Sequence, residues 1–227
     1  MMQSFTRHLP IATALLLALL LLRWPTIDLW FSALFYHPET GFFLRDRVWA
    51  VFIYHATNGV TLIALLGLLT ALLLPLLPAI RARWQPPLQR AQLLYLLFAL
   101  LLGPGLLVNE VLKNHWDRAR PSQVTEFGGG AQFTPPLLPA DECAENCSFV
   151  SGHAAMGFIL LAIGYATGRR RRWLLLALVV GGVIGMVRIV QGGHFLSDVI
   201  FSFYAVWGSS ALLYRSMQRW LSPNAPI

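Results

Sequence analysis

The stretch that organises the chain reads Arg188-Ile-Val-Gln-Gly-Gly-His194-Phe-Leu-Ser-Asp198, and it lies between two strongly apolar segments. Three ionisable side chains therefore stand where one apolar segment ends and the next begins. Charge near a bilayer core costs several kcal/mol, roughly 2.5 or more at the centre, and is usually paired and functional. We expect this stretch to supply a histidine, its orienting carboxylate and an anion-binding arginine.

The composition supports a membrane location for these segments. Of the 227 residues, 56% are hydrophobic and 12% are charged, and the mean hydropathy is +0.60. These values exclude an ordinary soluble domain and predict an all-α, multi-pass integral membrane protein with a single domain over residues 1–227. The net charge of +7 does not indicate nucleic-acid binding, because the basic residues are arginines in short clusters between apolar runs, with one lysine.

Six apolar stretches are long enough, or nearly so, to cross a hydrocarbon core about 30 Å thick. The first is interpreted as an uncleaved helix, because Arg23-Trp24-Pro25 lacks the small residues of a signal-peptide cleavage site. Residues 28–47 follow it and are expected to form an amphipathic segment on the outer surface. The six transmembrane helices are predicted near residues 8–24, 48–74, 91–112, 152–168, 173–190 and 197–215.

The basic residues predict the orientation of these helices. One set of helix ends carries ten of them and the opposite set carries seven, together with all ten acidic residues. The positive-inside rule then predicts that both termini are cytoplasmic and that the polar clusters at 113–120, 151–153 and 188–198 face outward. The ten basic residues assigned to the cytoplasmic side are Arg7, Arg81, Arg83, Arg90, Arg169, Arg170, Arg171, Arg172, Arg215 and Arg219.

The long outer loop, roughly residues 114–150, contains both cysteines of the chain. Cys143 and Cys147 are four residues apart, a spacing that a helical turn or a tight loop can bridge. On the outer side of the membrane they are expected to form a disulfide that fixes the approach to Ser151. A metal site is not expected, because no partner ligands occur at suitable spacing.

The first polar cluster consists of Lys113 and Arg120. They are seven residues apart, so they would share a helix face if the third helix continued until Pro121 stops it. Alone, the pair is also compatible with cations at a lipid headgroup interface. In the same helix, Asn109 is expected to bond the bent backbone near Pro104.

The second cluster is Ser151-Gly152-His153 at the start of the predicted fourth helix. Ser151 is a natural N-cap residue, and Gly152 lets the backbone approach a ligand closely. The free N–H groups of a helix start favour anions such as phosphate. His153 brings a titratable group to the same place.

In the third cluster, His194 and Asp198 are four residues apart. On one helix face, the carboxylate would accept a hydrogen bond from the imidazole Nδ1 and leave Nε2 free to attack. The alternative is a buried pair that only braces two helices. Two glycines ahead of His194 allow a tight turn and close approach of a substrate.

Together the three clusters resemble the tripartite signature of the type 2 phosphatidic acid phosphatase (PAP2) superfamily. They span residues 113–198 and have the order and spacings of that signature. The matching residues are Lys113, Arg120, Pro121, Ser151, Gly152, His153, Arg188, His194 and Asp198. The resemblance implies a PAP2-like bundle of six membrane helices whose active site faces outward.

The resemblance also implies a role for each residue. Lys113, Arg120 and Arg188 would hold the phosphate oxygens, aided by Ser151 and the backbone around Gly152. His194, oriented by Asp198, would attack phosphorus and form a phosphohistidine. His153 would protonate the leaving group and later take a proton from water. No cofactor or metal is expected.

The function that follows is a lipid phosphate or pyrophosphate phosphatase on the outer face of a bacterial cytoplasmic membrane. Its substrate would be undecaprenyl pyrophosphate, phosphatidylglycerol phosphate, phosphatidic acid or a lipid A phosphate, with the lipid chains left in the membrane. A lipid phosphotransferase with the same site is one alternative. A phosphate-binding transporter is another, and a metallohydrolase using His115, His153 and His194 is a third.

Overall fold

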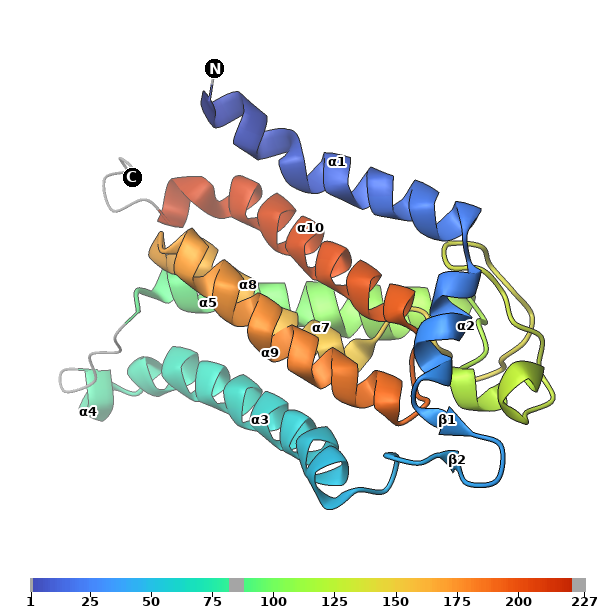
Figure 1. Cartoon of the computed structure of the whole chain (residues 1–227). Helices are drawn as coiled ribbons and strands as arrows, with labels where there is room; N and C mark the ends of the chain where they lie inside the picture. Colours follow the sequence, from blue (N-terminus) through green and yellow to red (C-terminus); the bar gives the residue numbers. More distant parts are fainter. Residues whose placement is uncertain (1, 82–87, 222–227) are drawn as a thin grey trace.

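The computed structural model describes residues 2–81 and 88–221 as a bundle of long helices with an irregular layer at one end (Figure 1). The helices of the bundle are α1 (Met2–Arg23), α3 (Val48–Leu73), α5 (Arg90–Leu100), η2 (Leu101–Leu112), α6 (Lys113–His115), α7 (Gly152–Phe158), α8 (Leu160–Thr167), α9 (Arg170–Val190) and α10 (Leu196–Leu221). The shorter elements are α2 (Thr26–Ala33), β1 (Tyr36–His37), β2 (Gly41–Phe42), η1 (Leu74–Leu76), α4 (Pro78–Arg81), η3 (Pro121–Gln123) and η4 (Thr125–Phe127).

Four helical stretches are long and apolar enough to cross a membrane, namely Val48–Leu76, Arg90–His115, Arg170–Val190 and Leu196–Leu221. A fifth is added if the α1–α2 pair, bent by 83°, counts as one span. The predicted span at 152–168 is an apolar but shorter helix, Gly152–Thr167. The described residues therefore contain four or five clear spans, and the predicted total of six stays a prediction.

The predicted third helix is continuous from α5 through η2 to α6. Helix η2 is a π-helix, in which backbone hydrogen bonds join residues five apart instead of four. Pro104 lies inside η2. The carbonyl of Pro104 accepts a hydrogen bond of 2.8 Å from Nδ2 of Asn109, which confirms the bond expected there. This side-chain bond satisfies a carbonyl in the widened part of the helix.

The segment after α1 turns across the end of the bundle. Pro25 stands at the break, and α2 then runs at 83° to α1. Trp30 is 64% exposed, whereas Asp28 and Ser32 on the other side of α2 are buried. These two sides agree with the amphipathic segment predicted here, although the carboxylate on the buried side was not expected.

Small residues let the helices around the site pack closely. An added Cβ at Gly157 in α7 would lie 2.5 Å from the Cα of Gly181 in α9. At Gly185 in α9, an added Cβ would lie 2.3 Å from a methyl group of Val199 in α10. Close packing of this kind is how helices associate inside a membrane, where apolar burial against lipid gains little.

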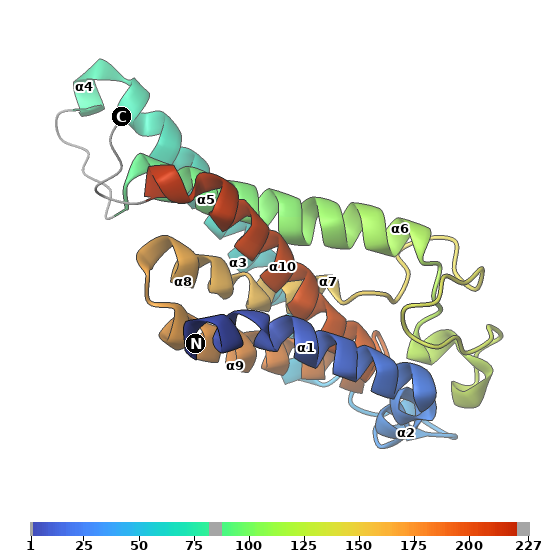
Figure 2. The ribbon, with the colours of Figure 1, turned by 90° about the horizontal axis from the view of Figure 1, so that it is seen from above.

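The two ends of the bundle differ in character. The start of α1 and the end of α10 lie together at one end, with α4 nearby (Figures 1 and 2). The other end carries α2, the β1–β2 hairpin and the loop between α6 and α7 (Figure 2). All three predicted polar clusters lie at or beside this second end, as the sequence predicts.

Candidate active site

His194 lies in the short connection between α9 and α10 and is fully buried. Its Nδ1 is 2.7 Å from the backbone carbonyl oxygen of Ser148. A carbonyl only accepts, so Nδ1 carries the hydrogen and donates it. The other ring nitrogen, Nε2, has no hydrogen bond to a described residue. Nε2 therefore carries the lone pair that can attack an electrophile.

The predicted pairing of His194 with Asp198 is present, but the two residues do not share a helix face and their side chains are further apart than a hydrogen bond. Helix α10 begins at Leu196, so His194 precedes it, and Nδ1 is 3.7 Å from Oδ2 of Asp198. The carboxylate instead caps the helix start by accepting from the backbone N–H of Phe195 at 2.8 Å. It acts on the histidine through Ser148, whose hydroxyl donates to Oδ2 at 2.5 Å and whose carbonyl holds the ring.

A buried ion network holds Asp198 in place. Arg118 donates to Asp198 at 2.6 Å and to Asp28 at 2.8 Å, and the side chains of all three are 0% exposed. Asp28 also accepts from the backbone N–H of Ser197 at 2.9 Å. The guanidinium carbon lies 4.4 Å from the centre of the Phe195 ring. Complete burial of three charges is tolerated only when they are paired in this way.

Sequence reasoning missed the roles of Arg118 and Asp28, which it counted only among the charges on the outer side. Asp28 is 90 positions from Arg118 and lies on a short helix that reads as a surface segment. The spacing of Arg118 to Arg120 gives no sign that one is buried and the other is not. Only the approach of α2 to the start of α10 could have identified the pair.

Burial also determines the protonation of the histidine. Complete burial lowers the pKa of His194 from 6.5 to about 3, although Asp198 nearby acts in the opposite direction. The positive charges of Arg188 and Lys113 add to the lowering. The imidazole is therefore neutral at pH 7, which is the form that a nucleophile requires.

Lys113 and Arg120 meet at Asn146 rather than on one helix face. The helix ends at His115 and Arg120 is in extended backbone, so the predicted shared face is wrong. The Nζ of Lys113 donates to Oδ1 of Asn146 at 2.9 Å, and Nε of Arg120 donates to the backbone carbonyl of the same residue at 3.0 Å. One residue of the loop thus holds both cations, a role that the sequence did not indicate.

Asn146 lies inside the ring closed by Cys143 and Cys147. Their sulfur atoms are bonded in the structure, with the Cα atoms 5.7 Å apart. Ser148, whose carbonyl orients His194, follows the ring directly. The bridged Cys147 therefore stands between the residue that holds the cations and the residue that holds the histidine.

Arg188 lies at the end of α9 and is 8% exposed. Its guanidinium bonds the side-chain oxygen of Gln191, and its carbon lies 4.8 Å from the centre of the Tyr54 ring. An added Cβ at Gly193 would meet the same guanidinium at 2.2 Å. Gly193 therefore leaves the space that the guanidinium of Arg188 occupies.

Ser151 and Gly152 form the start of α7 as predicted. The hydroxyl of Ser151 accepts a bond of 3.4 Å from the backbone N–H of Ala154, which is an N-cap. An added Cβ at Gly152 would lie 2.6 Å from Oδ1 of Asn109 and 3.5 Å from Nζ of Lys113. The absence of a side chain at Gly152 therefore lets the helix start approach the lysine.

His153 is held by stacking. Its ring lies against Tyr54 of α3, with the centroids 4.4 Å apart and the planes at 23°. Tyr54 thus contacts both His153 and Arg188, and neither contact was indicated by the sequence. The Nε2 of His153 is buried without a hydrogen bond to a described residue. Contacts through Tyr54, Asn146 and Ser148 therefore connect the predicted site residues at one end of the bundle.

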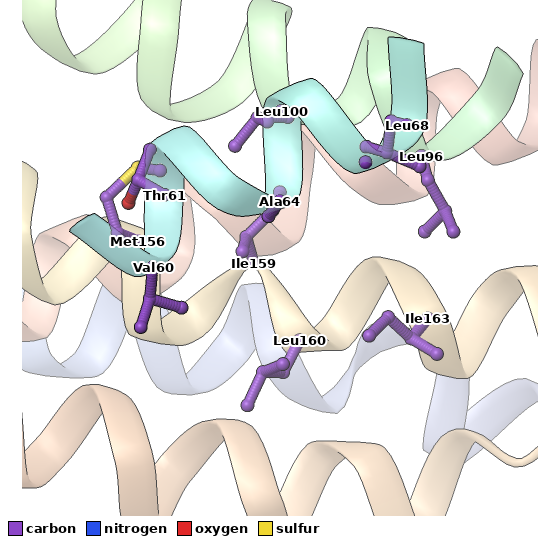
Figure 3. A pocket seen from close by; sticks show the side chains of 11 residues that line it. Val60, Thr61, Ala64, Leu68, Leu96, Leu100, Met156, Ile159, Leu160 and Ile163 are labelled. Atoms are coloured by element: carbon purple, nitrogen blue, oxygen red, sulfur yellow. The ribbon is translucent and has the colours of Figure 1, made fainter. Parts of the chain in front are cut away.

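Two cavities flank this cluster. An apolar cavity of about 390 Å³ lies between α3, α5 and α7–α8, and Met156, one turn from His153, is in its lining (Figure 3). A polar cavity of about 530 Å³ lies between the end of η2 and the disulfide ring, and Lys113 is in its wall. The site therefore has apolar space beside α3 and α5 and polar space beside the disulfide ring.

Comparison with known proteins gives three similar relatives, all named lipid A 4'-phosphatase. The protein from Francisella tularensis subsp. novicida is 41% identical over 136 residues, which cover 57% of this chain and 61% of that protein. The protein from Rhizobium leguminosarum is 38% identical over 57% of this chain and 55% of its own length. The protein from Rhizobium etli is 38% identical over 52% of this chain and 46% of its own length. The matches thus span roughly half of each relative.

The family comparison covers the site itself. No solved structure matches the chain. The model of the PAP2 superfamily matches residues 92–222, which include all three polar clusters. The chain belongs to the PAP2 superfamily.

Proposed function

We propose that this protein is a membrane lipid phosphatase that works through a phosphohistidine on His194. The observation that carries the proposal is the position of the neutral, fully buried His194 near two cations, Lys113 and Arg188, at one end of a membrane bundle. A phosphate ester is the substrate that needs both features, because phosphoryl transfer depends mainly on positioning and on stabilisation of negative charge.

Three cations bind the phosphate in this proposal. Lys113 and Arg120 approach it from the side of Asn146, and Arg188 approaches from the side of Tyr54. Guanidinium groups suit this task because their planar forks match phosphate oxygens. A Cβ added at Gly152 would lie 3.5 Å from Nζ of Lys113, so the backbone at this helix start is close enough to supply further N–H donors.

In the first step, Nε2 of His194 attacks phosphorus, so that an N–P bond forms and the bond from phosphorus to the lipid oxygen breaks. The Nδ1 hydrogen bond to Ser148 stabilises the positive charge that develops on the ring. His153 donates a proton to the leaving oxygen. A bound phosphate dianion favours the imidazolium form of His153 that this step needs.

In the second step, His153 takes a proton from water while the water oxygen attacks phosphorus. The N–P bond breaks, and inorganic phosphate leaves with His194 neutral again. Its burial favours return to that state.

The apolar cavity supports a lipid as the substrate. Its walls are the membrane-spanning helices α3 and α5 together with α7–α8, and aliphatic side chains such as Val60, Leu100 and Ile163 line it (Figure 3). An acyl or prenyl chain fits such a lining, whereas a water-soluble phosphate gains nothing from it. The names of the relatives make lipid A the first substrate to test, followed by phosphatidic acid, phosphatidylglycerol phosphate and undecaprenyl pyrophosphate.

We also propose that six segments cross a bacterial cytoplasmic membrane, with both termini inside and the site facing outward. The arginines at the start of α9 and in the last turns of α10, at the end of the bundle opposite the site, support this orientation, whereas Arg83 lies outside the described residues. A single cysteine introduced at Glu39 is expected to react with a membrane-impermeant maleimide in intact cells, and one at Arg171 only after permeabilisation. Each variant needs Cys143 and Cys147 replaced by serine. The reverse pattern would contradict the orientation.

The catalytic proposal is tested with the purified full-length protein in detergent or bilayers. Phosphate release from the four lipids is measured for wild type and for His194→Ala, with chelator present. We expect release by wild type from one or more of the lipids, strong inhibition by vanadate, and loss of release in the variant. An unchanged rate in His194→Ala would overturn the mechanism.

The same experiment separates the alternatives. Phosphorylated acceptor lipid without free phosphate would identify a phosphotransferase that shares the first step. Binding of lipid phosphate without any phosphoenzyme would instead indicate a transporter. Loss of activity in chelator would indicate a metallohydrolase.

A further inference from the structure

The polar cavity at the outer end adjoins the proposed phosphate site. It has a volume of about 530 Å³ and lies between the end of the third membrane helix and the disulfide ring. Buried Lys113 is in its wall, so a group in the cavity is a direct neighbour of a phosphate bound to that lysine. The other polar side chains that matter here are Glu110, Asn114, Glu145 and Asn146.

The lining of this cavity offers hydrogen bonds rather than apolar contact. Nδ2 of Asn114 and Oε2 of Glu110 are 3.4 Å apart, at the long end of a hydrogen bond, and the carboxylate of Glu145 bonds no described residue. Carboxylate oxygens accept up to about four hydrogen bonds and donate none. The cavity therefore favours a group that brings several O–H or N–H donors.

The charges that line the polar cavity further restrict which groups can occupy it. The two carboxylates outnumber the ammonium of Lys113, which is already bonded to Asn146. A second phosphate in the cavity would face this negative pair at close range, which is unfavourable. The occupant next to the phosphate is therefore not a second anion.

We propose that this cavity binds a sugar that carries the phosphate, and that Glu110, Asn114 and Glu145 hydrogen-bond its hydroxyl or amide groups. Around the phosphate, phosphatidic acid has only ester acceptors and undecaprenyl pyrophosphate has a second phosphate, so neither can donate to the carboxylates. Phosphatidylglycerol phosphate offers only a single glycerol hydroxyl. A sugar ring offers donors at adjacent positions, and bonds to a charged acceptor are the stronger kind. This inference rests on the proposed phosphatase function and makes a phosphorylated glycolipid the preferred substrate.

The test compares two substrates on the full-length protein in the same detergent, namely lipid A and dioleoyl phosphatidic acid. Glu145→Gln and Asn114→Ala are expected to lower kcat/KM for lipid A by about tenfold each, the effect of one lost hydrogen bond to a charged or polar group. For phosphatidic acid, both variants are expected to stay within about twofold of wild type. Ala144→Phe, which fills the cavity from the ring, is expected to give the same selective loss.

Glu39→Gln is the matched control, because Glu39 is an exposed acid in the β1–β2 turn and lies outside the cavity lining. It is expected to change neither rate. Equal losses on both substrates, or no loss on lipid A, would overturn the sugar site while leaving the phosphatase intact. A wild-type protein that hydrolyses phosphatidylglycerol phosphate or undecaprenyl pyrophosphate but not lipid A would overturn this inference alone, and one that hydrolyses none of the four lipids would overturn the proposed function and this inference together.

Discussion

The two histidines of the site are held in opposite ways. His194 is 0% exposed and hydrogen-bonded through Nδ1, behind a network of three buried charges. His153 is partly buried and is held by stacking on Tyr54. A nucleophile gains from a fixed orientation, whereas a group that gives and then takes a proton must meet two different partners. The difference in support thus matches the difference in proposed role.

The largest loss of activity is expected when His194 is replaced. His194→Ala should lower kcat by about 10⁵-fold or more, because no other group can accept the phosphoryl group. His153→Ala should cost about 10²- to 10⁴-fold, the usual value of general acid–base catalysis. Quenching with denaturant at alkaline pH, where an N–P bond is stable, after incubation with lipid labelled in its phosphate should trap phosphoenzyme in wild type and in His153→Ala, and none in His194→Ala. Equal losses for the two variants would contradict the assignment.

Removing the buried cation should break the support of His194 without touching the substrate. Arg118→Ala leaves Asp28 and Asp198 as unpaired buried charges, which typically costs about 3–5 kcal/mol. Thermal or denaturant unfolding in detergent measures the loss. Arg45→Ala, which removes an exposed arginine bonded to the carbonyl of Gln191, is the control and should cost less than about 1 kcal/mol. Similar values for both would contradict the network.

Acid should lower the stability that depends on the buried, neutral His194. The pKa of His194 is about 3 in the folded protein and 6.5 when unfolded, so protons bind the unfolded chain more readily. The stability from this residue is complete above pH 6.5 and falls as the pH drops toward 3. Unfolding midpoints measured between pH 8 and pH 4 should fall less steeply in His194→Gln, which does not titrate. Parallel curves would show that another group dominates.

The smallest effect is expected at the stacked histidine. Tyr54→Ala removes the ring contact of both His153 and Arg188, each worth about 0.5–1.5 kcal/mol, so kcat/KM should fall by roughly three- to tenfold for one contact and more for both. Tyr54→Phe keeps the ring and should stay near wild type. A loss in Tyr54→Phe as large as in Tyr54→Ala would assign the effect to the hydroxyl instead.

The sequence predicts those features of the site that depend on residues close together along the chain. The Ser151 cap, the tight turn before His194 and the bond from Asn109 to Pro104 all follow from residue types within a few positions of one another. Apolar length likewise gave the helices within a few residues at most ends, such as α3 at Val48–Leu73 against the predicted 48–74.

The unpredictable part depends on distant contacts. Neither Asp28 nor Asn146 has a sequence pattern that points to its partner, because Arg118 and Lys113 come near them only through the fold of the outer layer. The predicted helical spacing of His194 and Asp198 failed because α10 starts two residues after the histidine. A shift of two residues in a helix boundary decides which atoms meet, and composition does not locate a boundary that finely.

The bend after α1 has a consequence for biosynthesis. Asp28 is bonded to Ser197, 169 positions later in the chain. Asp28 and Arg118 can pair with each other before α10 exists, but Ser197 and Asp198, which complete their bonds, are added only with α10. A chain that stops before α10 would keep Arg118 without Asp198 and Asp28 without Ser197. The network of three buried charges therefore closes only once α10 is in place.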